Sequence, residues 1–115
     1  MSYDLRISVR VHGTDLHAVI ATPEYDNPTY NLGVMFRMAM DWDFKQGDWY
    51  PCAEVFDNIT RGIQELTDQP DKYRQYEPDN GWGTIEQAIR GLKSLKNCIC
   101  EQMEEIPLEH LYVAW

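Results

Sequence analysis

The sequence predicts a single α+β domain, residues 1–115, in which a small antiparallel sheet packs against about three helices. Three observations predict this class. The chain begins with two strand-like segments, continues with segments of helical spacing, and returns to strand-type residues over 108–115. The expected order of elements is β-β-α-α-α-β, and a two-layer arrangement lets such a sheet bury one face beneath the helices.

The first two elements form a predicted hairpin. Residues 3–11 alternate, and the side chains expected on the buried face are Tyr3, Leu5, Ile7, Val9 and Val11. Gly13 can take a positive φ, so "HGTD" turns the chain into a second strand over residues 16–22. Two prolines make residues 23–29 a loop.

Helical spacing begins at Asn31 and predicts a first helix to about Met40. Residues 41–51 form an aromatic-rich connection, and Pro51 suits the first position of a second helix. The apolar stripe of that helix is Val55, Ile59, Ile63 and Leu66. Residues 68–81 interrupt the helical pattern, with one short helical turn expected around Tyr73.

The stretch "QYEPDNGWGTIEQAI" raises the question of whether it holds a ligand or starts a helix. Thr84 and Gln87 match a capping box before the longest periodic segment, which we expect to end near Ile106. The two glycines beside Trp82 allow a sharp turn, and the indole is expected to cover the core as a lid. A phosphate-binding loop would need more glycines, a lysine and a preceding strand, so we favour the helix start over a ligand loop.

The C-terminal segment "LEHLYVAW" follows Pro107 and alternates Leu111, Val113 and Trp115 with other residues. We expect it to dock as a third strand beside the N-terminal hairpin. If this strand lies at the sheet edge, it can also pair with a second chain and form a homodimer.

Composition limits the classes of function. Hydrophobic residues make up 43% of the chain, which is enough for a core. The net charge of −9, from 19 acidic and 10 basic residues, argues against direct binding to nucleic acid and favours a basic protein partner or simple solubility. The chain has no apolar run long enough for a membrane span and no signal peptide, so we expect a cytoplasmic protein.

No residue pattern predicts a catalytic, metal or cofactor site. "DWDFKQGD" lacks the ligands of a calcium loop, and a metal-assisted hydrolase could use only Asp41, Asp43 and one histidine. Cys98 and Cys100 point to opposite sides of a helix and cannot bind the same ion, so we expect both to be small buried groups.

A second acidic run comprises Glu101, Glu104, Glu105 and Glu109, and no basic residue follows Lys96. Negative charge near a helix C-terminus opposes the helix dipole by about 0.3–1 kcal/mol per charge, so this run is either a solvated face or a functional surface. Glu101 and Glu105 are expected one turn apart on the same side of the helix.

Aromatic residues concentrate in or beside the predicted loops, where they serve as core lids or as interface anchors. Together with the acidic runs they define candidate protein-binding residues: Asp41, Asp43, Asp48, Trp49, Glu101 and Glu105. The alternative is a small-ligand pocket that would use Tyr30, Arg37 and Trp82 to bind a nucleotide or signalling molecule.

Three segments carry a resemblance that spans nearly the whole chain: "PTYNLGVMFRMAMDWDFKQGDWY", "YEPDNGWGT" and "IPLEHLYVAW". With them, the chain resembles a set of short acidic proteins carried by prophages and mobile elements of anaerobic Gram-positive bacteria. The resemblance brings no catalytic residue to carry over, and it implies a genomic setting in which such proteins inhibit host defence enzymes or block toxins.

The sequence hypothesis is therefore a non-enzymatic inhibitor that engages a basic host protein, such as a defence nuclease or a toxin, through an acidic and aromatic surface. Such a surface would also suit a nucleic-acid mimic. A small-ligand binding protein is the alternative, and a metal-assisted hydrolase is the least favoured hypothesis.

Overall fold

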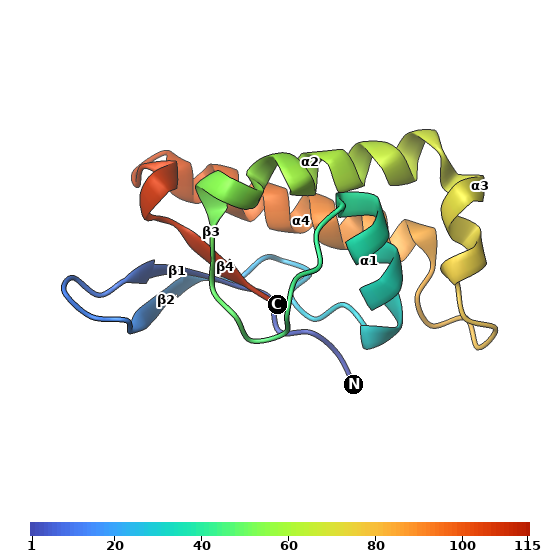
Figure 1. Cartoon of the computed structure of the whole chain (residues 1–115), viewed down its shortest axis with the longest axis horizontal. Helices are drawn as coiled ribbons and strands as arrows, with labels where there is room; N and C mark the ends of the chain where they lie inside the picture. Colours follow the sequence, from blue (N-terminus) through green and yellow to red (C-terminus); the bar gives the residue numbers. More distant parts are fainter.

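The structure, a computed structural model, describes all residues 1–115 and confirms the predicted α+β class. Figure 1 shows the helices lying above a small sheet, with the N-terminal hairpin at one end of the long axis. The elements are β1 (Arg6–Arg10), β2 (His17–Ala21), α1 (Gly33–Met40), β3 (Tyr50–Pro51), α2 (Cys52–Asp68), α3 (Pro70–Tyr73), α4 (Ile85–Met103) and β4 (Tyr112–Ala114). Three short 3₁₀ turns join these elements. Tyr30–Leu32 precedes α1, Arg74–Tyr76 follows α3, and Leu108–His110 precedes β4.

The sheet has the order β2-β1-β4-β3, and all neighbouring strands are antiparallel. The C-terminal strand docks beside the hairpin as predicted, with Ser8 of β1 opposite Tyr112 of β4. The expectation that β4 could lie at the sheet edge is wrong, because the unpredicted strand β3 pairs with its other side through Tyr50 and Val113. The strands at the two edges are β2 and β3.

The alternating pattern of the first strand holds only in part. Tyr3, Leu5 and Ile7 are buried, but Val11 is 43% exposed. A β-bulge between Ile7 and Ser8 shifts the register against β2, and Ser8 becomes fully buried. Its hydroxyl lies 2.9 Å from Nδ1 of His17, which gives this buried polar group a partner.

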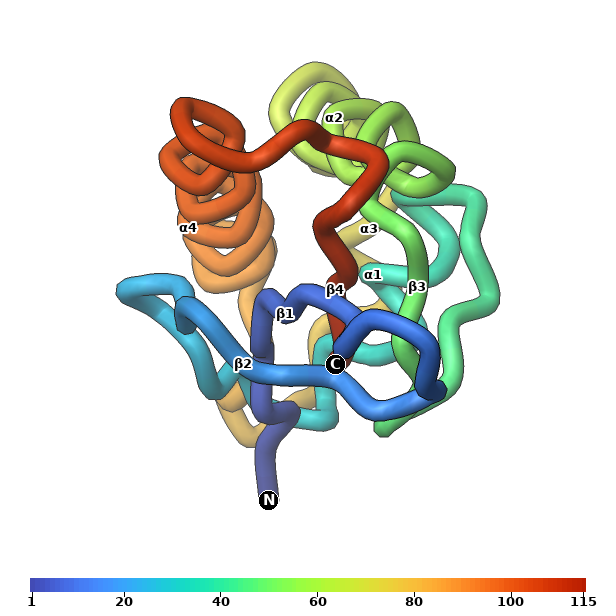
Figure 2. The backbone as a smooth tube through the Cα atoms, turned by 90° about the vertical axis from the view of Figure 1, so that its left-hand side faces the viewer, coloured from blue at the N-terminus to red at the C-terminus, as the bar shows by residue number.

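The helical layer is built around α2 and α4, which run side by side over the sheet (Figures 1 and 2). Gly62 of α2 lies against Met40 at the end of α1 and against Leu92 of α4. A Cβ atom there would lie 2.6 Å from Cγ of Met40 and 2.9 Å from Cδ1 of Leu92, so only glycine fits this position without a shift.

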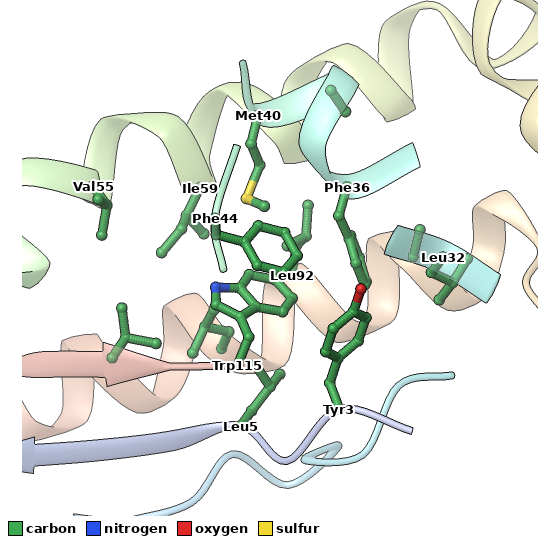
Figure 3. Close-up of a cluster of buried hydrophobic side chains, with 14 of the residues drawn as sticks. Tyr3, Leu5, Leu32, Phe36, Met40, Phe44, Val55, Ile59, Leu92 and Trp115 are labelled. Carbon is green, nitrogen blue, oxygen red and sulfur yellow. The ribbon is translucent and has the colours of Figure 1, made fainter. Parts of the chain in front are cut away.

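The core is centred on Trp115, which is 1% exposed. Its ring stacks on Phe44 at 4.3 Å between centroids and packs against Phe36 at 5.0 Å (Figure 3). The backbone oxygen of Trp115 accepts a hydrogen bond of 3.0 Å from the N–H of Gly47. The connection between α1 and β3 is thereby tied to the last strand of the sheet.

The cysteines separate as their spacing requires. Cys52 and Cys98 are buried, and burial together with the neighbouring Cys98 raises the pKa of Cys52 to about 12. The expectation that Cys100 is also buried is wrong, because residues two apart on α4 face opposite sides and Cys100 faces solvent. None of the helices is both long enough and apolar enough to cross a lipid bilayer.

Candidate functional site

The four tryptophans occupy different environments. Trp115 is buried, Trp42 and Trp49 are half-buried, and Trp82 is 66% exposed. The prediction that Trp82 covers the core as a lid is therefore wrong. A large aromatic side chain in solvent is costly to hydrate and is a typical anchor of protein interfaces.

Consecutive backbone N–H groups of the loop that carries Trp82 all have acceptors. The N–H of Gly81 donates to the carbonyl of Pro78 at 3.4 Å, and the N–H of Trp82 donates to Oδ1 of Asn80 at 2.9 Å. Oε1 of Gln87 accepts from Gly83 at 2.9 Å and from Thr84 at 3.1 Å.

The start of α4 completes this network. Oγ1 of Thr84 accepts from the N–H of Gln87 at 3.2 Å, so the predicted capping box is confirmed. Oε2 of Glu77 accepts from the N–H of Ile85 at 2.9 Å. Arg74 lies between the two flanks of the loop, within 3.5 Å of the carboxylate of Glu77 and 3.7 Å of that of Glu86. The loop backbone is thus fixed from both sides.

Glycine is required on both sides of the exposed indole. Gly81 has φ 78° and Gly83 has φ 111°, values that other residues rarely adopt. A Cβ atom at Gly83 would also lie 3.1 Å from Cβ of Asn31. The loop therefore packs directly against the residue that leads into α1.

Helix α1 follows Asn31 in the chain and carries two further exposed apolar residues. Val34 is 56% exposed and Met38 is 51% exposed, and their spacing of four places them on one side of the helix. We call these three exposed apolar residues, Trp82, Val34 and Met38, the Trp82 patch. Figure 1 shows α1 and the loop before α4 in the same part of the molecule, away from the hairpin.

Two exposed carboxylates lie close in the chain to members of the Trp82 patch. Asp41 follows α1 in a left-handed conformation with φ 51°, and Asp79 lies in the Trp82 loop. Both are exposed, and neither takes part in an ion pair of the structure. The patch therefore combines an apolar centre with uncompensated negative charge at its border.

The other predicted protein-binding residues of the 41–51 connection are placed differently. Asp43 is exposed, but its carboxylate lies 2.8 Å from Nζ of Lys45, and this hydrogen bond is the main reason that its pKa is lowered. Asp48 is exposed without an ion pair. Trp49 is half-buried and stacks on His17 at 4.7 Å, with the guanidinium of Arg6 5.2 Å from its ring centre.

The two predicted glutamates at the end of α4 are both exposed, but they do not share a helical face. Helix α4 ends at Met103, three residues earlier than predicted, so Glu105 lies in the turn that follows. Glu101 is on the helix and lines the open groove described below.

Two of the predicted ligand-binding residues, Arg37 and Tyr30, make contacts within the protein. Arg37 donates from Nε to the carbonyl of Phe44 at 3.0 Å and covers the ring of Phe44 at 4.2 Å. The hydroxyl of Tyr30 accepts a hydrogen bond from the side chain of Gln46. Neither Arg37 nor Tyr30 lines the groove beside α4 or the smaller hollow beside the hairpin turn.

The larger hollow, of about 790 Å³, is an open groove lined by residues of α4 and of the segment that follows β2. Its charged side chains have both signs, with Arg90 and Lys93 beside Glu24, Glu86 and Glu101. Arg90 lies 4.8 Å from the ring centre of Tyr25, so part of its positive charge is engaged within the groove.

No three side chains of histidine, cysteine, aspartate or glutamate gather where they could hold a metal ion. Comparisons with protein-family models, with curated proteins and with solved structures found no match for this chain.

Sequence reasoning missed Val34 and Met38, although a signal was present. The buried stripe of α1 is Leu32, Met35, Phe36 and Ala39, so Val34 and Met38 are apolar residues on the face that should be polar.

Proposed function

We propose that the protein is a non-enzymatic binding protein that inhibits a basic host protein on behalf of a mobile genetic element, and that it binds through the Trp82 patch. The observation that carries this proposal is the exposure of Trp82 on a backbone fixed by hydrogen bonds. A rigid loop loses little entropy on binding, so such a tryptophan can contribute most of its burial to affinity.

Charge supports the choice of a basic partner. The chain carries a net charge of −9, and Asp41 and Asp79 border the apolar centre without ion pairs. An apolar pocket surrounded by lysine or arginine on the partner would complement both properties. The carboxylates would then speed association and select the partner, while the apolar centre would hold it.

The proposal is tested by affinity capture from a bacterial host lysate, with proteins identified by mass spectrometry. The baits are the wild type, Trp82→Ala and a matched control, Leu16→Ala. Leu16 is 68% exposed on the hairpin at the other end of the molecule, so its replacement removes exposed apolar surface elsewhere. We expect one basic protein to be captured by the wild type and by Leu16→Ala, and lost with Trp82→Ala.

The dependence on salt separates the contribution of the carboxylates from that of the apolar centre. Replacing Asp41 and Asp79 by Asn should slow association and reduce its dependence on salt, with little change in dissociation. Equal capture by the wild type and Trp82→Ala would contradict the proposal.

A further inference from the structure

The β1–β2 hairpin lies at the opposite end of the long axis from the loop before α4 (Figure 1). A second, smaller hollow lies beside the turn of this hairpin. Its volume is about 360 Å³. It is formed where the hairpin turn meets the chain leading into β4, and its walls are Val9, Arg10, His12, Gly13, His110 and Tyr112.

The polar side chains of this hollow are free to bind. Arg10 takes part in none of the ion pairs of the structure. The one histidine ring with a hydrogen bond is that of His17, so the rings of His12 and His110 have no partner within the protein. The hydroxyl of Tyr112 is a further donor that lines the same space.

The absence of carboxylates from this lining is unusual for the chain. Acidic residues outnumber basic residues by 19 to 10, yet none lines this hollow. The larger groove, by contrast, includes three glutamates. The smaller hollow is therefore a local cationic site on an acidic protein, and its positive charge grows as the histidines gain protons.

Neighbouring charged groups modulate this site. Asp15 lies farther along the hairpin turn, Glu109 directly precedes His110, and His17 of β2 pairs with Arg10 across the hairpin. The two carboxylates oppose a bound anion. Because both are outside the lining, we expect weak binding that depends on contact with Arg10 and the two histidines.

We propose that this hollow binds a tetrahedral oxyanion, a phosphate or sulfate group, held by Arg10 and by His12 and His110 in their protonated forms. The planar guanidinium of arginine offers paired donors that match the oxygens of such a group. The imidazolium groups add charge and two further donors. Binding should therefore strengthen as the pH falls.

The test is a titration of the intact protein with sodium sulfate, followed by chemical shifts of the backbone amides and histidine rings. Sulfate stays dianionic at about pH 6 and at about pH 7.5, so any pH dependence reports the protein and not the anion. Ionic strength is held constant with chloride. We expect saturable shifts at His12 and His110, and an affinity at least about threefold tighter at the lower pH.

Variants assign the contacts. Arg10→Gln, His12→Gln and His110→Gln should each weaken sulfate binding by about threefold, because each removes one exposed charged contact. Arg90→Gln, which removes an equally exposed cation from the larger groove, is the matched control and should leave the affinity unchanged.

Parallel titrations with inorganic phosphate and O-phosphoserine identify the source of the anion. Tighter binding of phosphoserine would support a phosphorylated ligand, and equal affinity would support the free ion. The proposal is overturned if no anion gives saturable shifts, if the affinity is the same at both pH values, or if the His12→Gln, His110→Gln double variant binds sulfate as the wild type does.

Discussion

The connection between α1 and β3 and the loop before α4 both place tryptophan and tyrosine beside acidic residues, and the fold uses them in opposite ways. In the connection, Trp42 packs edge-on against Trp115 at 6.1 Å and against Tyr50 at 4.9 Å. In the loop, Trp82 is 66% exposed although the N–H groups of residues 81–85 all have acceptors. Aromatic content alone therefore does not distinguish rings that pack in the core from a ring that is held in solvent.

The reason for the difference is what lies opposite each segment. The connection faces the end of β4, where Trp115 supplies a ring to stack on and a carbonyl that accepts from Gly47. The Trp82 loop meets the short turn before α1, where a Cβ atom at Gly83 would lie 3.1 Å from Cβ of Asn31. Gly83 takes up that close contact, and the indole of the preceding residue is left exposed.

The largest expected effect is the loss of Trp115. Trp115→Ala should lower the free energy of unfolding by about 3–5 kcal/mol, because it leaves a cavity among Phe44, Phe36 and Tyr3. Urea denaturation measures this change. If the alanine variant does not fold, Trp115→Phe should still unfold at lower urea than Trp82→Ala, which is expected within about 0.5 kcal/mol of wild type. Equal stability of the two variants would contradict the assignment of core and surface.

The next effect concerns binding. Trp82→Ala should weaken partner affinity by about thirtyfold, equivalent to about 2 kcal/mol, because an exposed tryptophan at an interface centre is a typical hot spot. Val34→Ala and Met38→Ala should show smaller losses in the same direction. Titration calorimetry with the captured partner measures all three. Losses at Val34 and Met38 without a loss at Trp82 would place the interface on α1 alone.

A smaller effect is expected from the residue that holds the loop. Gln87→Ala removes the acceptor for two N–H groups and should cost about 1 kcal/mol in the free energy of unfolding, with some loss of partner affinity. Gln87→Glu keeps an acceptor at the same place and is the matched control. Full affinity in the alanine variant would show that loop rigidity does not matter for binding.

The smallest expected effect concerns His17, which stacks on Trp49 at the end of the connection between α1 and β3. Burial, and then the charge of Arg10, lower the pKa of His17, which stacks on Trp49. A histidine with a lowered folded-state pKa contributes stability above its unfolded pKa of about 6.5 and loses it as the pH falls through the folded value. The urea midpoint should therefore fall slightly on acidification in the wild type, relative to His17→Phe, which keeps the stack without a titrating group. If the urea midpoints of the wild type and His17→Phe changed in parallel across that pH range, His17 would make no pH-dependent contribution to stability.

Local signals were sufficient for much of this structure. Helical spacing placed α1, α2 and α4, the pair Thr84 and Gln87 identified the capping box, and the alternation of residues 111–115 identified β4. These features depend on residues close together in the chain. The same is true of the two glycines that flank Trp82.

Features set by distant residues were not predicted. Strand β3 has two residues and exists because β4 offers a free edge beside it. The β-bulge that buries Ser8 depends on His17 across the hairpin. The close approach of Gly83 to Asn31 joins residues about fifty positions apart in the chain, and no periodicity within the loop indicates that contact.

Fluorine NMR of protein labelled with 5-fluorotryptophan tests directly whether Trp82 is presented to solvent while Trp115 completes the core. The change in each of the four signals on transfer from H₂O to D₂O reports the exposure of that ring, and single Trp→Phe variants assign the signals. We expect the largest solvent shift for Trp82 and almost none for Trp115. A small shift for Trp82, comparable to that of Trp115, would contradict this expectation and remove the basis for a partner site on this loop.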